Sequence, residues 1–158
     1  MRVWAARGQT PVLHVDPGRA LTHFYGTLNL HTGQDIVMRT PTMNAATTAQ
    51  HLTQILLAIP RRPILLLWDK APWHFGEPIR QVLAANPRLE ILYFPTAAPD
   101  LNPQEQVWKA VRSAISHNHA CATLEKLAQG FEQHLISHTF PSAFLDLYGF
   151  NAISPMFI

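Results

Sequence analysis

The strongest constraint on the fold is an uninterrupted apolar run that ends in a carboxylate. Residues 64–68 are Ile-Leu-Leu-Leu-Trp, Pro63 precedes them, and Asp69 follows directly. A run without polar alternation is typical of a strand buried on both faces, as in parallel sheets flanked by helices. In open α/β sheets, sites form at the carboxyl ends of strands. The run therefore predicts an α/β domain with Asp69 at a sheet edge where a site can form.

The segments on either side of this run predict a meander followed by alternating helices and strands. Further strands are expected at residues 11–15, 21–30, 35–39 and 89–94, and helices at 44–59, 76–85, 103–117 and 123–138. A proline-rich loop is expected at 95–99. This order favours one α/β domain with a mixed sheet. The length of 158 residues is sufficient for a hydrophobic core.

Composition narrows the class of protein without identifying its chemistry. Hydrophobic residues make up 47% of the chain and charged residues 14%, which indicates a globular domain. No apolar run approaches the roughly 20 residues needed to cross a bilayer. The single cysteine, Cys121, excludes an internal disulfide framework and suits a reducing cytoplasm. The net charge of +2 permits a polyanionic partner but does not require one.

A second acidic residue, Glu105, lies at the predicted start of a helix. Asn102 can serve as the N-cap and Pro103 as the first helical residue, which places Glu105 at the capping-box position. The helix dipole also favours a carboxylate there. Asp69 has a similar structural explanation as a turn or capping residue. From the residues alone, a structural and a functional interpretation stay open for both acids.

As a pair, Asp69 and Glu105 suggest metal-dependent phosphoryl transfer. Mg²⁺ prefers oxygen ligands and keeps several waters, so one or two carboxylates plus phosphate oxygens are enough to hold it. Two such ions about 4 Å apart can activate an attacking hydroxyl and stabilise the leaving oxygen of a phosphodiester. Both acids are therefore candidate catalytic residues and candidate metal ligands.

Two blocks around these acids resemble those of mariner-type insertion-sequence transposases, the DDE superfamily endonucleases. The first is residues 67–74 (LWDKAPWH), and the second is residues 94–108 (FPTAAPDLNPQEQVW). The 35 residues between the acids (105 − 69 − 1) are close to the family's separation. Residues 4–11 and 24–28 also resemble family segments, so the resemblance covers nearly the whole chain.

The resemblance implies an RNase H-like fold in which Asp69 and Glu105 hold Mg²⁺ or Mn²⁺. It implies DNA as the partner, both transposon ends and target, cut and joined at the element ends. No membrane and no small-molecule substrate are expected, and the location implied is the bacterial cytoplasm, in association with the nucleoid. Two alternatives stay open: an inactive transposase remnant that only binds DNA or protein, and another RNase H-like nuclease.

Two departures from the family's pattern bear on activity. Lys70 stands where the family usually has Asn. The family's first catalytic Asp lies on a strand upstream of the segment that matches residues 4–11. We therefore expect a single catalytic domain over 1–158, without that first strand and without the amino-terminal helix-turn-helix. Such a chain is expected to be weak or inactive alone, and to form a homodimer through its open sheet edge.

Other polar residues have weaker claims to a role in the site. Asp16 belongs to an Asp-Pro-Gly turn sequence, and Asp35 is interpreted as the start of a strand. His74 matches the family's motif and is expected to support the site, whereas Trp108 is expected to pack beneath it. Two histidine groups, His117 and His119 with Cys121, and His134 with His138, lack a zinc-site spacing. The scattered basic residues that could contact phosphate are Arg61, Arg62, Lys70, Arg80, Arg88, Lys109 and Arg112.

Overall fold

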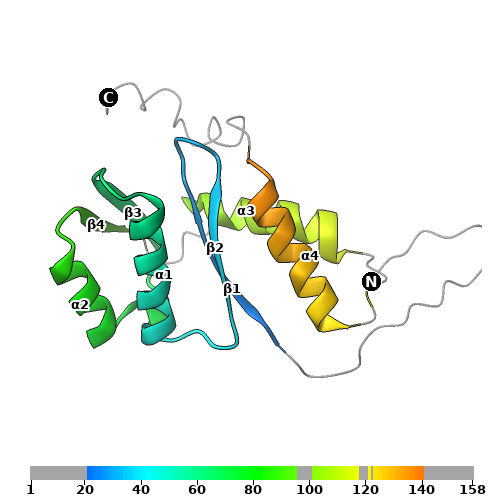
Figure 1. Cartoon of the computed structure of the whole chain (residues 1–158), viewed down its shortest axis with the longest axis horizontal. Helices are drawn as coiled ribbons and strands as arrows, with labels where there is room; N and C mark the ends of the chain where they lie inside the picture. Colours follow the sequence, from blue (N-terminus) through cyan, green and yellow to red (C-terminus); the bar gives the residue numbers. More distant parts are fainter. Residues whose placement is uncertain (1–20, 96–100, 118–120, 122, 141–158) are drawn as a thin grey trace, which may run out of the picture.

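The structure is a computed structural model that describes residues 21–95, 101–117, 121 and 123–140. Its elements are β1 (His23–Leu28), β2 (Asp35–Thr40), α1 (Ala45–Ala58), β3 (Ile64–Trp68), a short 3-10 helix (Pro72–His74), α2 (Glu77–Ala85), β4 (Leu89–Tyr93), α3 (Pro103–Val111), a π-helical turn (Arg112–Ser116) and α4 (Leu124–Ser137) (Figure 1). The predicted elements within the described residues are confirmed to within a few residues, except that the helix predicted at 103–117 changes to π-helical geometry after Val111. The strand predicted at 11–15 and most of the loop predicted at 95–99 lie outside the described residues.

The strands form two pairs with different directions. β1 and β2 are antiparallel, with Leu28 opposite Asp35, whereas β3 and β4 are parallel, with Trp68 opposite Tyr93. Among the described residues, no strand pairing joins the two halves. Both kinds of pairing that a mixed sheet contains are present, in two separate two-stranded sheets among the described residues.

Helix α1 packs against both halves of the sheet. Its N-terminus is fixed by a capping box in which the Asn44 side chain accepts from the Thr47 N–H at 2.9 Å, and Thr47 Oγ1 accepts from the Asn44 N–H at 3.0 Å. The buried face of α1 shares an apolar cluster with α2, β3 and β4: Ala49, Leu52, Ile55, Leu56, Leu66, Ile79 and Leu89. Since each fully buried aliphatic side chain contributes about 1.5–3 kcal/mol, this cluster fixes the position of β3 and its carboxyl end.

A second apolar cluster lies on the other face of the β1–β2 hairpin. It consists of Val37, Val107, Val111, Leu135 and Phe140, and so joins β2 to α3 and α4. Residues alternate along β2, with Ile36 at the margin of the α1 cluster and Val37 in this one. The hairpin is thus enclosed between α1 on one side and α3 with α4 on the other (Figure 1).

The expectation that β3 is buried on both faces is wrong. Leu66 faces the helices and is 7% exposed, but Leu65 on the opposite face is 60% exposed. Leu92 on β4 is likewise 54% exposed. The physical reason is that α1 and α2 cover a single face of the parallel pair, and no described element covers the other. An apolar run alone cannot distinguish these two cases.

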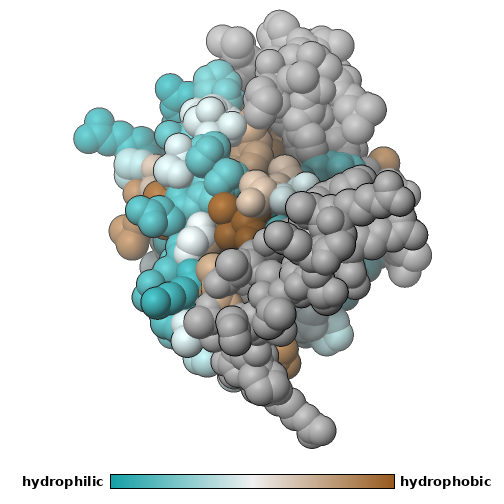
Figure 2. All heavy atoms as spheres, turned by 90° about the vertical axis from the view of Figure 1, so that its right-hand side faces the viewer, coloured by the Kyte–Doolittle hydropathy of each residue, from teal (hydrophilic) through white to brown (hydrophobic). Residues whose placement is uncertain are grey.

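The described surface and the described helices can be compared with what a membrane-spanning segment requires. On the side that carries α3 and α4, the described surface is mostly hydrophilic around a small hydrophobic patch (Figure 2). None of the helices within the described residues is long and apolar enough to cross a bilayer.

Candidate active site

Asp69 leaves the carboxyl end of β3 and enters a tight turn. Its Oδ1 accepts a hydrogen bond from the Ala71 N–H at 3.0 Å and lies 2.8 Å from His74 Nδ1. The hydrogen bond from His74 lowers the pKa of Asp69, and the Ala71 N–H adds a smaller effect, while partial burial opposes both. The carboxylate is therefore ionised at neutral pH. Its side chain is 52% exposed, so solvent and ligands have access to it.

His74 is held firmly behind this carboxylate. It is 7% exposed, and its ring stacks on that of Trp68 with centroids 4.2 Å apart. Its Nδ1 also lies 3.2 Å from the backbone oxygen of Asp69. Thr48 of α1 fixes the same turn by donating to the Trp73 carbonyl at 2.9 Å. His74, which was expected to support the site, thus lies against Asp69, and its contact orients the carboxylate.

Glu105 lies in the first turn of α3, as the sequence predicts. The Asn102 side chain accepts from the Gln104 N–H at 3.1 Å, and Pro103 follows as the first helical residue. The reciprocal bond of a capping box is not formed. Among the described residues, the Glu105 carboxylate makes no hydrogen bond and no ion pair. It is a half-buried acid, stabilised by the helix N-terminus and available to a ligand.

The two acids come from different layers of the fold. Asp69 follows a strand packed against α1, whereas Glu105 begins a helix on the opposite face of the hairpin. Among the described residues, no group of three or more His, Cys, Asp and Glu side chains could hold a metal ion. Lys70 is exposed beside Asp69, where it departs from the family's pattern.

A buried polar pair next to Glu105 was not predicted. Asp35 starts β2, as expected, but it is 8% exposed and accepts from Gln104 Nε2 at 2.9 Å. Burial raises the pKa of Asp35 to about 7, although hydrogen bonds from Gln104 and the Thr27 backbone act in the opposite direction. The alternation of residues along β2 could have indicated that Asp35 is buried, because Asp35 lies on the same face of the strand as the apolar Val37.

A second buried polar residue, His51, lies on α1 and contacts β1. Its Nε2 lies 2.9 Å from Thr27 Oγ1, and its Nδ1 lies 3.2 Å from Gln54 Oε1. The ring stacks on Tyr25 with centroids 5.3 Å apart. Burial is the main reason why the pKa of His51 falls to about 4, and His74 lowers it further. His51 is therefore a neutral residue of the core.

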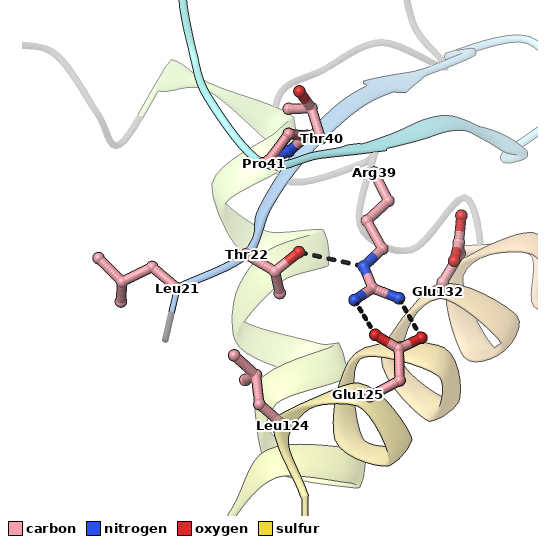
Figure 3. A pocket seen from close by; sticks show the side chains of 8 residues that line it. All are labelled: Leu21, Thr22, Arg39, Thr40, Pro41, Leu124, Glu125 and Glu132. Carbon is pink, nitrogen blue, oxygen red and sulfur yellow. Dashed lines mark hydrogen bonds and ion pairs between the residues drawn. The ribbon is translucent and has the colours of Figure 1, made fainter. Parts of the chain in front are cut away.

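The groove between the β1–β2 hairpin and α4 is separate from both acids. Arg39 reaches across it and forms a two-point ion pair with Glu125, at 2.8 and 2.5 Å, while Thr22 accepts from Arg39 Nε at 3.1 Å (Figure 3). The pair lowers the pKa of Glu125 to about 2 and raises that of Arg39. These contacts attach α4 to the hairpin.

Trp108 and Arg88, two residues with predicted roles near the site, both have contacts within the fold. Trp108 packs against Phe131 with centroids 6.2 Å apart, which confirms its packing role. Arg88 donates to the carbonyls of Leu56 at 2.7 Å, Ile59 at 2.5 Å and Arg62 at 3.0 Å, and so closes the end of α1. Its guanidinium therefore has a structural role in the fold.

The histidine groups give no zinc site in the part of the chain that the structure describes. His134 and His138 stack with centroids 3.7 Å apart, and His138 Nδ1 lies 3.0 Å from the His134 carbonyl oxygen. His119 lies outside the described residues, as does Asp16.

An antiparallel hairpin is followed by two parallel strands, with one acid after the first parallel strand and another at the start of the helix that follows the second. This order fits an RNase H-like α/β domain. The chain belongs to the DDE superfamily endonuclease family, whose model matches residues 1–128. It is 26% identical over 126 residues to an insertion element IS630 protein of 39 kDa from Shigella sonnei, covering 78% of this chain and 36% of the relative.

Solved structures support the same fold. The Mos1 transposase paired-end complex with the left transposon end has a TM-score of 0.62 at 19% identity, covering 87% of this chain and 43% of that one. The Mos1 mariner paired-end complex with Mn has a TM-score of 0.56 at 19% identity, covering 88% and 44%. The chain thus spans less than half the length of the relatives that it matches.

Proposed function

We propose that this chain is a DNA transposase catalytic domain that cleaves and joins phosphodiesters at insertion-sequence ends. The observation that carries the proposal is the contrast between the two acids. Asp69 is oriented by His74 at the end of β3, while Glu105 has no partner among the described residues. The helix N-terminus favours a carboxylate at this position in either case, but no capping-box bond occupies the Glu105 carboxylate, so it is available to a ligand.

The donor set suits a hard divalent cation. Asp69 is ionised at neutral pH and half-exposed, and both candidate ligands offer carboxylate oxygens, as Mg²⁺ and Mn²⁺ prefer. When bound, the metal would supply charge stabilisation at the scissile phosphate and lower the pKa of the attacking hydroxyl. Asp69 and Glu105 would hold it. His74 would keep the Asp69 carboxylate in one orientation, and Lys70 would offer a cation to a phosphate oxygen.

The alternative is a family member that binds DNA without cutting it. Two observations favour it: no three-ligand metal group occurs among the described residues, and Lys70 places a positive charge beside Asp69. A cation next to a metal ligand weakens divalent binding by electrostatic repulsion. The two candidate functions share the fold and the DNA partner, and they differ in whether phosphodiester bonds are broken.

Metal-dependent nicking of DNA carrying insertion-sequence ends separates these functions. The comparison uses the full chain, Asp69→Asn, Glu105→Gln and, as a matched control, Glu90→Gln, which removes an exposed strand carboxylate away from both acids. Because the chain is expected to be weak at most, we expect a low level of nicking that requires Mg²⁺ or Mn²⁺ and that is abolished in the first two variants only. Activity unchanged in both would refute the site, while DNA binding without nicking would establish the alternative.

Self-association is a further part of the proposal. The outer edges of the two strand pairs present unpaired backbone groups among the described residues, and such edges promote pairing with another chain. We propose a homodimer formed through such an edge. Light scattering over a concentration series tests it, and a monomer at all concentrations would contradict it.

A further inference from the structure

Asp35 and Gln104 form a buried polar link between β2 and the first turn of α3. Both residues are more than nine-tenths buried, at 8% and 9% exposure, and Gln104 Nε2 donates to Asp35 Oδ2 at 2.9 Å. The remaining polar atoms of the same two side chains, Asp35 Oδ1 and Gln104 Oε1, are buried without a hydrogen-bond partner. Among the described residues, no other buried side-chain oxygen or nitrogen is left in this state.

A single proton on Asp35 would satisfy both unpartnered oxygens if Oδ1 donated it to Gln104 Oε1. An ionised carboxylate has acceptors only, so it cannot satisfy the amide oxygen of Gln104. A neutral carboxylic acid has one O–H donor, and a carboxylic acid and a primary amide can pair at two points. Leaving two buried polar groups unpaired would cost several kcal/mol, so a protonated Asp35 is strongly favoured on hydrogen-bond grounds. Burial acts in the same direction.

The link holds the first turn of α3 against β2. Gln104 directly precedes Glu105, and its neighbour Asn102 caps the same turn. The first two turns of α3 lie so close to β1 that a Cβ on Gly26 would overlap Gln104 Nε2 and approach Trp108 Cη2 to 2.6 Å. With the helix pressed onto the strand, a shift of Gln104 moves Glu105 with it.

We propose that Asp35 is a positioning residue, which pairs with Gln104 as a neutral acid and thereby fixes the place of Glu105 relative to the strands. The inference rests on the proposed role of Glu105 as a metal ligand. Asp35 does not itself belong to the metal site, because its carboxyl group is enclosed with Gln104 and is bonded to that amide.

The test compares two changes at Asp35 in the full chain. Asp35→Asn keeps the shape, stays neutral, and can pair with Gln104 at two points, whereas Asp35→Ala removes the pair. Gln104→Ala removes the other partner of the same hydrogen bond. It replaces Asp35→Ala in the comparison if that variant does not fold. Gln133→Ala, an exposed residue of α4, is the matched control for Gln104→Ala. The readouts are Mn²⁺ affinity by electron paramagnetic resonance and the Glu105 amide signal in metal-free ¹⁵N–¹H spectra.

We expect Asp35→Asn to bind Mn²⁺ within about twofold of the unmodified chain, and Asp35→Ala and Gln104→Ala to bind it roughly 10- to 100-fold more weakly. The Glu105 amide signal should move in the two alanine variants only. Equal losses in Asp35→Asn and Asp35→Ala would overturn the proposal, since they would make the negative charge essential. Unchanged affinity in the alanine variants would overturn it as well.

The metal-free spectra separate this inference from the proposed function. If the unmodified chain binds no Mn²⁺, the metal-ligand role of Glu105 fails, and the amide signal alone decides whether Asp35 positions that residue. A Glu105 signal that moves in both alanine variants but not in Asp35→Asn supports the positioning role. A signal that stays in place in all three variants refutes it.

Discussion

His74 Nδ1 lies 2.8 Å from Asp69 Oδ1, in the turn that directly follows β3. The imidazole is buried against Trp68, so it cannot follow the carboxylate if that group moves. The contact explains in physical terms why a histidine occurs five residues after the acid: it lowers the pKa of Asp69 and selects one rotamer for it.

Removing this contact should raise the pKa of Asp69. His74→Phe retains a stacking ring on Trp68 but lacks the nitrogen, so the largest cause of the low pKa disappears. We expect the Asp69 titration, followed by ¹³C carboxyl NMR, to move to higher pH, and Mn²⁺ affinity to fall about tenfold. His31→Phe, an exposed change in the hairpin turn, is the control. A titration midpoint equal to that of the unmodified chain would exclude the orienting role.

Asp35 should make the fold less stable as the pH rises. Its pKa is about 7 in the folded chain and 3.8 ordinarily, so the folded state binds more protons between these values. The contribution of the protonated Asp35 to the free energy of unfolding is fully present below about pH 4 and is lost as the pH rises past 7. The upper bound on this loss is about 4 kcal/mol. Urea unfolding between pH 4 and 8 measures it. Asp35→Asn should abolish this decline, and a decline that persists in the variant would contradict the assignment.

His51 should make the fold more stable as the pH rises, the opposite of the effect of Asp35. Its pKa is about 4 in the folded chain against 6.5 ordinarily, so the unfolded state binds more protons in that window. Stability should therefore rise from pH 4 to 6.5, by up to about 3 kcal/mol. The rise is partly hidden by Asp35 in the unmodified chain and should emerge in Asp35→Asn. In Asp35→Asn/His51→Gln the profile should be nearly flat, and a remaining slope would point to other groups.

The sequence allowed the positions of both acids to be predicted, because local signals determine them. An apolar run sets the end of β3, and Asn102 with Pro103 sets the start of α3. The Asp35–Gln104 link joins residues 69 positions apart, so no local pattern could show it. The exposure of one face of β3 could not be predicted either, because it depends on which helices pack against the strand. An apolar run is the same whether one or two layers cover it.

The close approach of α3 to β1 makes Gly26 a sensitive position in β1. In Gly26→Ala, the new methyl group would overlap Gln104 Nε2 and approach Trp108 Cη2 to 2.6 Å, so these two α3 side chains must be displaced. Both are packed in place, so we expect the displacement to be passed on to the helix. We expect a loss of about 1–3 kcal/mol in the free energy of unfolding, and weaker Mn²⁺ binding because Glu105 moves with the helix.

Gly130 offers a matched comparison within α4. A Cβ there would meet only Ile115 Cγ2 at 3.8 Å, an ordinary contact. Since alanine is favoured over glycine inside a helix, Gly130→Ala should gain about 0.5–1 kcal/mol and leave Mn²⁺ affinity unchanged. Urea unfolding and Mn²⁺ titration of both variants test the pair. If Gly26→Ala kept both its stability and its Mn²⁺ affinity, the packing of α3 on β1 would not set the position of Glu105.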